Sequence, residues 1–215
     1  MDSDRGKFIT FEGGDGCGKT TQIKLAAEYL AAEGYDYLLT REPGGTMIGE
    51  KIREVLLDPE NAEMSDMTEM LLYAAARAQI AKEVIRPALA AGRLVVCDRW
   101  TDSSLVYQGA ARGLGEVVRV VNSYAAGDLF APDATILLYL APDEAYARAV
   151  AGAGSGDRIE ALGADYQNKV QSAYMKLAAY DPKRFFVIDA SGSVTDVHER
   201  VKTALQKILA AGGGV

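Results

Sequence analysis

One stretch near the N-terminus constrains this chain more than any other. Residues 13–20 read Gly-Gly-Asp-Gly-Cys-Gly-Lys-Thr and match G-x-x-x-x-G-K-[ST], the pattern of a phosphate-binding loop. The apolar run 7–12 before it predicts a buried strand, and the periodic run 20–33 after it predicts a helix that Gly34 ends. Glycines let backbone N–H groups converge on phosphate, and the helix N-terminus favours an anion. This order of strand, glycine-rich loop and helix predicts a nucleotide site, although a glycine-rich turn that binds nothing would match the same sequence pattern.

The loop also carries the side chains that phosphate chemistry requires. Lys19 would reach the terminal phosphates of a nucleotide, and the Thr20 hydroxyl would be a ligand of Mg²⁺.

Composition excludes several classes of protein. The 215 residues suit one domain, 1–215, and 49% hydrophobic with 25% charged residues is typical of a globular protein. A net charge of −7 argues against a general nucleic-acid binder. Cys17 and Cys97 lack metal-ligand spacing and suit a reducing cytoplasm. The polar start of the chain predicts neither signal peptide nor anchor, and the apolar runs are too short to span a membrane.

Strand and helix patterns alternate along the chain. After the first strand, further strands are expected at 37–40, 94–98, 134–140 and 185–189. Helices are expected at 48–57, 67–91, 116–126, 142–150, 166–180 and 194–211, the last capped by Thr195 or Asp196, with 101–113 part helix and part loop. The alternation predicts an α/β fold: a P-loop NTPase-type three-layer sandwich with a parallel sheet of about five strands and helices on both faces. The glycine-rich residues 151–156 predict a short mobile lid at about 150–160.

Charged residues follow several predicted strands, at the sheet edge where such folds bind ligands. Asp98 could hold Mg²⁺, its water or the loop's own donors, or could be a simple strand-end charge. Five arginines, taken together in an acidic protein, resemble a second anion site: Arg41, Arg53, Arg77, Arg99 and Arg112.

Tyr73 and Arg77 lie four residues apart, on one face of a helix. The pair could stack on a base and hydrogen-bond to it. Spacing alone favours a core tyrosine beside a surface arginine.

Six sequence blocks occur in the order typical of one enzyme family. They are Phe11–Thr21 (F-E-G-G-D-G-C-G-K-T-T), Arg41–Gly45 (R-E-P-G-G), Tyr73–Arg77 (Y-A-A-A-R), Asp98-Arg99, Tyr107–Gly109 with Arg112-Gly113, and Asp157–Glu160 (D-R-I-E). With these blocks the chain resembles the thymidylate kinases, in the bacterial-type branch of the P-loop nucleoside monophosphate kinases, over about 8–189.

On the nucleotide side, the resemblance implies that the loop holds the ATP phosphates, with Lys19 on the transferring group and Asp98 near Mg²⁺. Arg148 and Arg158 match the arginines that flank the lid. The implied ATP-binding residues are Gly13, Gly14, Asp15, Gly16, Cys17, Gly18, Lys19, Thr20, Thr21 and Arg148, and the implied metal ligands are Thr20 and Asp98.

On the acceptor side, the resemblance implies that three arginines surround the acceptor phosphate: Arg41, Arg53 and Arg99. Asp15 and Glu42, beside Pro43, would face the sugar 3′-hydroxyl and the acceptor end. Tyr73 would stack on thymine, and Tyr107 would crowd the sugar 2′ position. The positions that match contacts to the base edge are Arg77, Ser104 and Gln108.

Two departures from the family pattern concern catalysis. No arginine stands between Arg148 and Arg158, and position 17 of the loop is Cys rather than Arg. Arg158 is the first candidate for stabilising transition-state charge and Arg99 the second, with Lys19 and Asp15 completing the expected catalytic set.

The expected activity is transfer of the ATP γ-phosphoryl group to dTMP, giving dTDP and ADP, with Mg²⁺ as cofactor and a cytoplasmic homodimer as the working form. The helices expected at 48–57 and 67–91 carry apolar surface that could pair two subunits. A kinase for another nucleoside monophosphate is one alternative. A GTPase or ATPase switch is another, but residues 168–171, N-K-V-Q, lack the acid that reads guanine.

Overall fold

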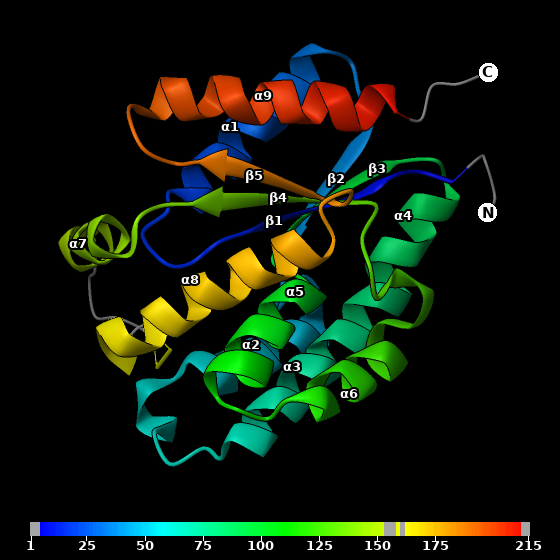
Figure 1. Ribbon diagram of the computed structural model, residues 1–215. Coiled ribbons are helices and arrows are strands. Elements are labelled where there is room, and N and C mark those ends of the chain that lie inside the picture. The colour runs from blue at the N-terminus through cyan, green and yellow to red at the C-terminus, as the bar shows by residue number, and fades with distance from the viewer. Residues whose placement is uncertain (1–4, 153–157, 160–161, 212–215) are drawn as a thin grey trace.

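A five-stranded parallel sheet forms the centre of the fold. The computed structural model describes residues 5–152, 158–159 and 162–211. The sheet has the order β2-β3-β1-β4-β5, with every neighbouring pair parallel (Figure 1). The strands are β1 (Phe8–Glu12), β2 (Tyr37–Arg41), β3 (Leu94–Asp98), β4 (Ala134–Tyr139) and β5 (Phe185–Asp189). The predicted α/β fold with a parallel sheet is therefore confirmed.

Helices connect successive strands, as parallel pairing requires. Their bounds are α1 (Lys19–Ala32), α2 (Met47–Leu57), α3 (Asp66–Ile80), α4 (Arg86–Ala90), α5 (Thr101–Ser104), α6 (Glu116–Ala126), α7 (Pro142–Gly152), α8 (Gly163–Tyr180) and α9 (Val194–Ala210). Short 3₁₀ turns cover Pro59–Asn61 and Gly127–Leu129, and π-helical segments cover Ala81–Ile85 and Leu105–Ala111.

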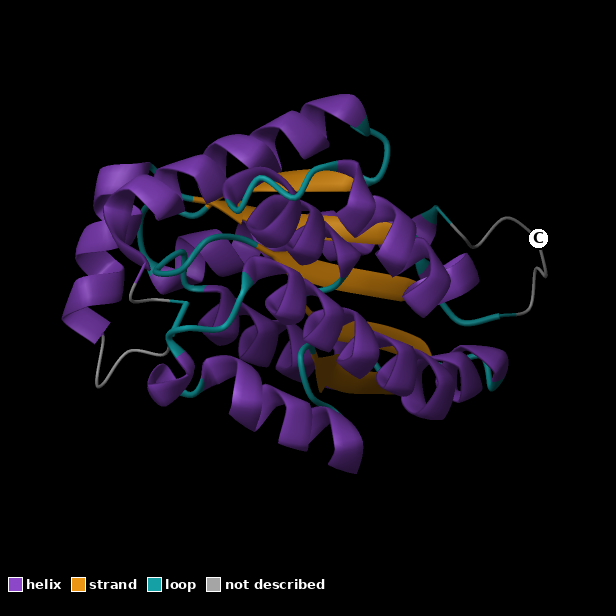
Figure 2. Cartoon of the chain, turned by 90° about the horizontal axis from the view of Figure 1, so that it is seen from below, coloured by secondary structure: helices purple, strands orange, loops and turns teal. Residues whose placement is uncertain are grey.

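The two faces of the sheet are covered by different helices. On one face lie α1 and α9 (Figure 1), which pack against alternate strand residues such as Ile9, Phe11 and Ile136, all fully buried. On the other face α3, α4 and α8 pack against residues of opposite parity, including Phe8 and Val95. Because the central strands are buried on both faces, they are mostly apolar rather than alternating, with Thr10, Glu12 and Thr135 as buried polar exceptions. Figure 2 views this second face, with the strands side by side behind the helices.

Two helical regions differ from the expectation in detail. The helix expected at 67–91 is found, but a π-helical segment, Ala81–Ile85, interrupts it. Pro87 lacks the N–H that would bond to the carbonyl of residue 83, which accounts for the wider turn there. Residues 101–111 are helical throughout, with more helix than the mixture of helix and loop expected, because Val106, Tyr107 and Gln108 are buried and packing overrides local preference.

The predicted cap of the last helix was wrong. Ser193, not Thr195 or Asp196, is the N-cap of α9, and its hydroxyl accepts from the Asp196 backbone N–H at 3.2 Å. Asp196 stands three residues on and accepts from the Ser193 N–H at 3.3 Å, which completes a capping box.

Most of the expected lid lies outside the described residues. The structure gives α7 as far as Gly152 and then Arg158 and Ile159. Among the described helices, none has the length and apolarity needed to cross a bilayer.

Candidate active site

The loop between β1 and α1 has the backbone geometry of a phosphate cradle. Gly13, Gly16 and Gly18 have φ values of 151°, 78° and 83°, a region that residues with a Cβ rarely adopt. A Cβ on Gly13 would lie 2.7 Å from the Leu138 carbonyl oxygen, so the close approach to β4 also requires glycine. No side chain caps α1 in the described structure, which leaves its first N–H groups for an anion.

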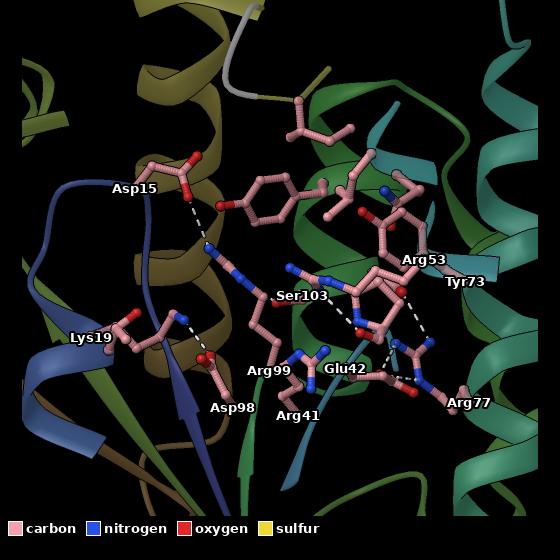
Figure 3. A pocket seen from close by; sticks show the side chains of 17 residues that line it. Asp15, Lys19, Arg41, Glu42, Arg53, Tyr73, Arg77, Asp98, Arg99 and Ser103 are labelled. Carbon is pink, nitrogen blue, oxygen red and sulfur yellow. Dashed lines mark hydrogen bonds and ion pairs between the residues drawn. The ribbon is translucent and has the colours of Figure 1, made fainter. Parts of the chain in front are cut away.

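Lys19 and Asp98 form an ion pair at the mouth of this loop. The Lys19 ammonium donates to Asp98 at the end of β3, and Figure 3 shows the two side chains facing one another. Asp98 therefore holds the loop's own donor, one of the roles considered for it. Thr20 follows Lys19 in the first turn of α1 and lines the same cavity.

A cavity of about 240 Å³ opens beyond the C-terminal ends of β1, β2 and β3. It contains residues predicted for both substrates. Its lining residues are Asp15, Lys19, Thr20, Arg41, Glu42, Pro43, Arg53, Leu57, Tyr73, Arg77, Asp98, Arg99, Ser103, Ser104, Tyr107, Gln108 and Ile159.

Arg77 and Glu42 form the most deeply buried ion pair of the cavity wall. The Arg77 Nη2 and the Glu42 Oε2 are 2.5 Å apart, and each side chain is 1% exposed. Arg77 also donates to Ser104 Oγ at 2.9 Å, to Asn122 and to the Trp100 carbonyl. Sequence spacing favoured a solvated arginine here, and that expectation was wrong, because the fold brings partners to Arg77 from three separate segments: the loop after β2, the start and end of α5, and α6.

Burial raises the pKa of Glu42 from its ordinary 4.5 to about 7, although Arg77 acts to lower it. The Glu42 Oε1 is buried and has no hydrogen-bond partner in the described structure, and the same is true of the Tyr107 hydroxyl. Buried polar atoms are normally paired. Two such atoms in one cavity wall indicate positions where a polar ligand would bind.

Arg99 joins the loop to the cavity. Its Nη2 contacts Asp15 Oδ1 at 3.0 Å (Figure 3), and its Nη1 donates to the Gly13 carbonyl at 3.1 Å. The guanidinium lies 5.1 Å from the centre of the Tyr107 ring, within cation–π range. Asp15 also accepts from Gln167 Nε2 at 2.8 Å, so α8 contacts the loop as well.

Two further arginines of the cavity come from β2 and α2. Arg41 pairs with Glu50 at 2.7 Å, and both side chains remain well exposed. Arg53 donates to the Pro43 carbonyl at 3.1 Å. In Figure 3 both arginines lie with Glu42 and Tyr73 on the side of the cavity away from Lys19. The structure thus brings together four of the five arginines expected at a second anion site.

Three predicted arginines do not line this cavity. Arg112 and Arg158 both pair with the buried carboxylate of Glu69, at 2.8 and 2.7 Å. Arg148 pairs with Glu144 at 2.6 Å, one turn back on α7. Glu69 also accepts from Gln108 Nε2 at 2.9 Å, so the buried carboxylate attracts groups that were expected to face ligand.

Sequence reasoning assigned no role to three residues that contact the site: Glu12, Ser103 and Tyr174. One signal was available, because Glu12 is an acid at the end of a predicted buried strand. Ser103 and Tyr174 carried no such signal, since a serine and a tyrosine on helices are compatible with many environments.

The fold and the cavity define an α/β P-loop protein of the phosphoryl-transferring class. A phosphate cradle and an arginine-rich pocket adjoin at the C-terminal edge of a parallel sheet, where doubly wound folds bind ligands.

Comparison with known proteins names the family. The family model described as thymidylate kinase matches residues 11–201. A thymidylate kinase of Caldanaerobacter subterraneus subsp. tengcongensis is 50% identical over 206 residues, 95% of this chain and 97% of the relative. Those of Symbiobacterium thermophilum and Geotalea uraniireducens are 49% and 43% identical, over 94% and 96% of this chain and 94% and 100% of the relatives. The chain belongs to the thymidylate kinase family.

Proposed function

We infer that this chain phosphorylates dTMP to dTDP, with ATP as the phosphoryl donor. The observation that carries the inference is the single cavity shared by Lys19 and Thr20 of the phosphate loop and by Arg41, Arg53 and Arg99. Two anionic ligands, one on each side, would meet end to end there. Positioning and charge neutralisation are what phosphoryl transfer chiefly requires of a protein.

On the donor side we propose that the loop amides and Lys19 bind the ATP phosphates. The cradle comprises Gly13, Gly14, Asp15, Gly16, Cys17, Gly18, Lys19, Thr20 and Thr21. On nucleotide binding, the Lys19 ammonium would leave Asp98 and contact the transferring phosphoryl group instead. Arg148, on α7, would contact ATP from the lid side.

Thr20 and Asp98 fit a Mg²⁺ site. One hydroxyl and one carboxylate line the cavity together, and no cluster of three His, Cys, Asp or Glu able to hold a metal occurs among the described residues. Mg²⁺ commonly keeps several waters and substrate phosphates and takes only one or two protein ligands, so this small donor set suits it. When bound, Mg²⁺ would neutralise phosphate charge.

On the acceptor side we propose that Arg41, Arg53 and Arg99 surround the dTMP phosphate. Glu42, beside Pro43, and Asp15 would take the sugar 3′-hydroxyl, because Glu42 Oε1 has no partner in the described structure. Tyr107 would crowd the sugar 2′ position.

For the thymine base we propose that Tyr73 stacks on the ring. Arg77, Ser104 and Gln108 would contact its edge. All four side chains line the cavity.

Arg99 is the better supported of the two candidates for transition-state charge. It lines the cavity and contacts Asp15 of the loop. Arg158 is buried against Glu69 and would have to leave that carboxylate to act. We therefore propose Arg99 as the resident charge stabiliser, and Arg158 as a candidate only if lid closure releases it.

A coupled assay of ADP release tests the function. Purified protein would be given ATP with dTMP, dUMP, dCMP, dAMP or dGMP in turn. Fast turnover with dTMP supports the proposal, and preference for another monophosphate would reassign the acceptor. ATP hydrolysis at the same rate without any acceptor would point to an NTPase switch instead.

We further propose that residues 1–215 act as one domain in a cytoplasmic homodimer. Exposed apolar side chains cluster on three adjacent helices, α2, α3 and α6, and they are Met47, Ile48, Val55, Met67, Leu71, Val117, Val120 and Tyr124. An unpartnered apolar surface of this kind is typical of a subunit interface. Both cysteines are free and buried, which suits a reducing compartment. Light scattering on a sizing column would give the dimer mass or contradict it.

A further inference from the structure

Glu12 is a fully buried carboxylate at the end of β1 that the proposed reaction does not use. Its Oε1 accepts from the Trp100 backbone N–H at 2.7 Å. Its Oε2 accepts from the hydroxyls of Ser103 and Tyr174, at 2.6 and 2.7 Å. All three donors are neighbours of one residue, Arg99.

The backbone at Arg99 is unusual. Arg99 has a φ of 68°, and it is the one residue other than glycine with positive φ in the described chain. A side chain costs energy in this left-handed region and stays there only where its surroundings enforce it. The Arg99 N–H bonds to the Phe11 carbonyl at 2.9 Å, and the next N–H, of Trp100, bonds to Glu12. The end of β1 therefore holds the turn on both sides of the strained residue.

The same carboxylate sets the direction of two hydroxyl groups. A serine or tyrosine hydroxyl has one proton to donate and lone pairs with which to accept. When Ser103 and Tyr174 give their protons to Glu12, their lone pairs remain for other donors. The Arg99 Nη1 donates to both oxygens, at 3.3 and 3.4 Å.

We propose that Glu12 is the positioning residue of Arg99. It holds the turn that presents Arg99 to the cavity, and it orients the Ser103 and Tyr174 hydroxyls so that they accept from the guanidinium. This inference rests on the proposed role of Arg99 in the reaction. Because Tyr174 belongs to α8, the network also ties the guanidinium to the helix that follows the lid segment.

The contacts of this network favour the ionised form of Glu12 and oppose the effect of its burial. Burial and the neighbouring Asp102 raise the pKa of Glu12, whereas Arg99 lowers it. A buried carboxylate is costly, and it is retained where it meets several donors.

A double-mutant cycle tests the proposal directly. The variants are Glu12→Gln, Arg99→Ala and the double mutant, compared by kcat and KM for dTMP and ATP. In Glu12→Gln an amide NH₂ replaces one carboxylate oxygen, so either the Trp100 N–H or the two hydroxyl groups lose their acceptor. We expect kcat to fall about tenfold or more, a coupling typical of residues in one network. In the Arg99→Ala background the same substitution should change kcat by less than about twofold.

Two further variants keep the test decisive if Glu12→Gln does not fold. Tyr174→Phe and Ser103→Ala each remove one hydroxyl and leave the carboxylate in place. Each should lower kcat in the wild-type background and have little effect beside Arg99→Ala.

Asp102→Asn is the matched control. Asp102 is another buried carboxylate, and it bonds to Arg184 and Thr135 rather than to Arg99. We expect this variant to lower the melting temperature while kcat does not fall, because removal of the Asp102 charge favours the ionised form of Glu12.

The outcomes distinguish a failure of the proposed role of Arg99 from a failure of the proposed role of Glu12. Wild-type activity in Arg99→Ala would remove the proposed role of Arg99, and the inference with it. An inactive Arg99→Ala with strictly additive effects of Glu12→Gln would overturn the inference alone. A Glu12→Gln variant that loses thermal stability but keeps kcat would show a structural carboxylate and would also overturn it.

Discussion

Lys19 of the phosphate loop forms an ion pair with Asp98, the last residue of the neighbouring strand β3. The pair is partly shielded, with side-chain exposures of 10% and 22%. The parallel pairing of β1 with β3 places the loop after one strand beside the acid at the end of the other. Binding of a nucleotide would replace one anionic partner of Lys19 with another, so the ammonium is held near its working position beforehand.

Lys19→Ala should leave a folded protein with very low turnover. Loss of one electrostatic contact to the transferring group should lower kcat on the order of 10²–10³. The coupled ADP-release assay measures this, with circular dichroism as the check on folding. Lys24→Ala, an exposed lysine on the same helix, is the control and should keep its activity. Full activity in Lys19→Ala would remove the assigned role.

Arg77→Ala should destabilise the protein far more than Arg41→Ala. Arg77 and Glu42 are buried, so removal of one partner leaves the other charge uncompensated and costs about 3–5 kcal/mol. Arg41 and Glu50 are 47% and 40% exposed, and such a pair is worth about 1 kcal/mol or less. Urea unfolding at pH 8 gives both free energies of unfolding. Equal losses would contradict the assignment of Arg77 to the core of the cavity wall.

Glu42 should give stability a distinctive pH dependence. Its pKa is raised from 4.5 to about 7 by burial, so the folded state holds this proton more tightly than the unfolded state does. Between those two pH values the unfolded chain binds fewer protons, and the free energy of unfolding falls as pH rises. The contribution of Glu42 is full below about pH 4.5 and is lost by about pH 7, amounting to about 3 kcal/mol.

Glu42→Gln removes this titration. The free energies of unfolding of wild type and variant would be measured from pH 4.5 to pH 8. Plotted against pH, the two curves should have different slopes between pH 4.5 and pH 7 and run parallel above pH 7. Curves that stay parallel over the whole range would show that Glu42 titrates normally.

Ser193→Ala should weaken the start of α9. The hydroxyl accepts from the Asp196 N–H, and loss of an N-cap of this kind costs about 1 kcal/mol. Thermal or urea unfolding detects the change, and kcat should not move because α9 lies on the opposite face of the sheet from α3 and α8. Thr195→Ala, two residues on and exposed, is the control and should fall within about 0.5 kcal/mol of the wild type. If the two variants lose the same stability, the capping role of Ser193 is wrong.

Local patterns were enough to predict the elements and the phosphate loop. The apolar run 94–97, followed by Asp98, is typical of a buried strand, and the loop at 13–20 has the spacing of a phosphate-binding loop. The helix caps and the π-helical segments were harder to predict. A cap depends on one hydrogen bond, and Ser193, Thr195 and Asp196 are all plausible caps from the sequence.

The environments of single side chains were the least predictable. Arg77, Arg112 and Arg158 are helix or loop arginines of similar appearance in the sequence, yet one lines the cavity and two turn to Glu69. Glu12 likewise gave no sign that it would meet Ser103 and Tyr174, which lie 91 and 162 residues away along the chain.

By itself the sequence determined the alternation of strands and helices, the phosphate cradle and the family, since periodicity and motif spacing are local properties. Only the tertiary structure decided the strand order, which arginines face the cavity, and which carboxylates hold them. Those choices depend on contacts between segments far apart in the chain, where burial makes an unpaired charge costly and so fixes each arginine to the acid that the fold brings within reach.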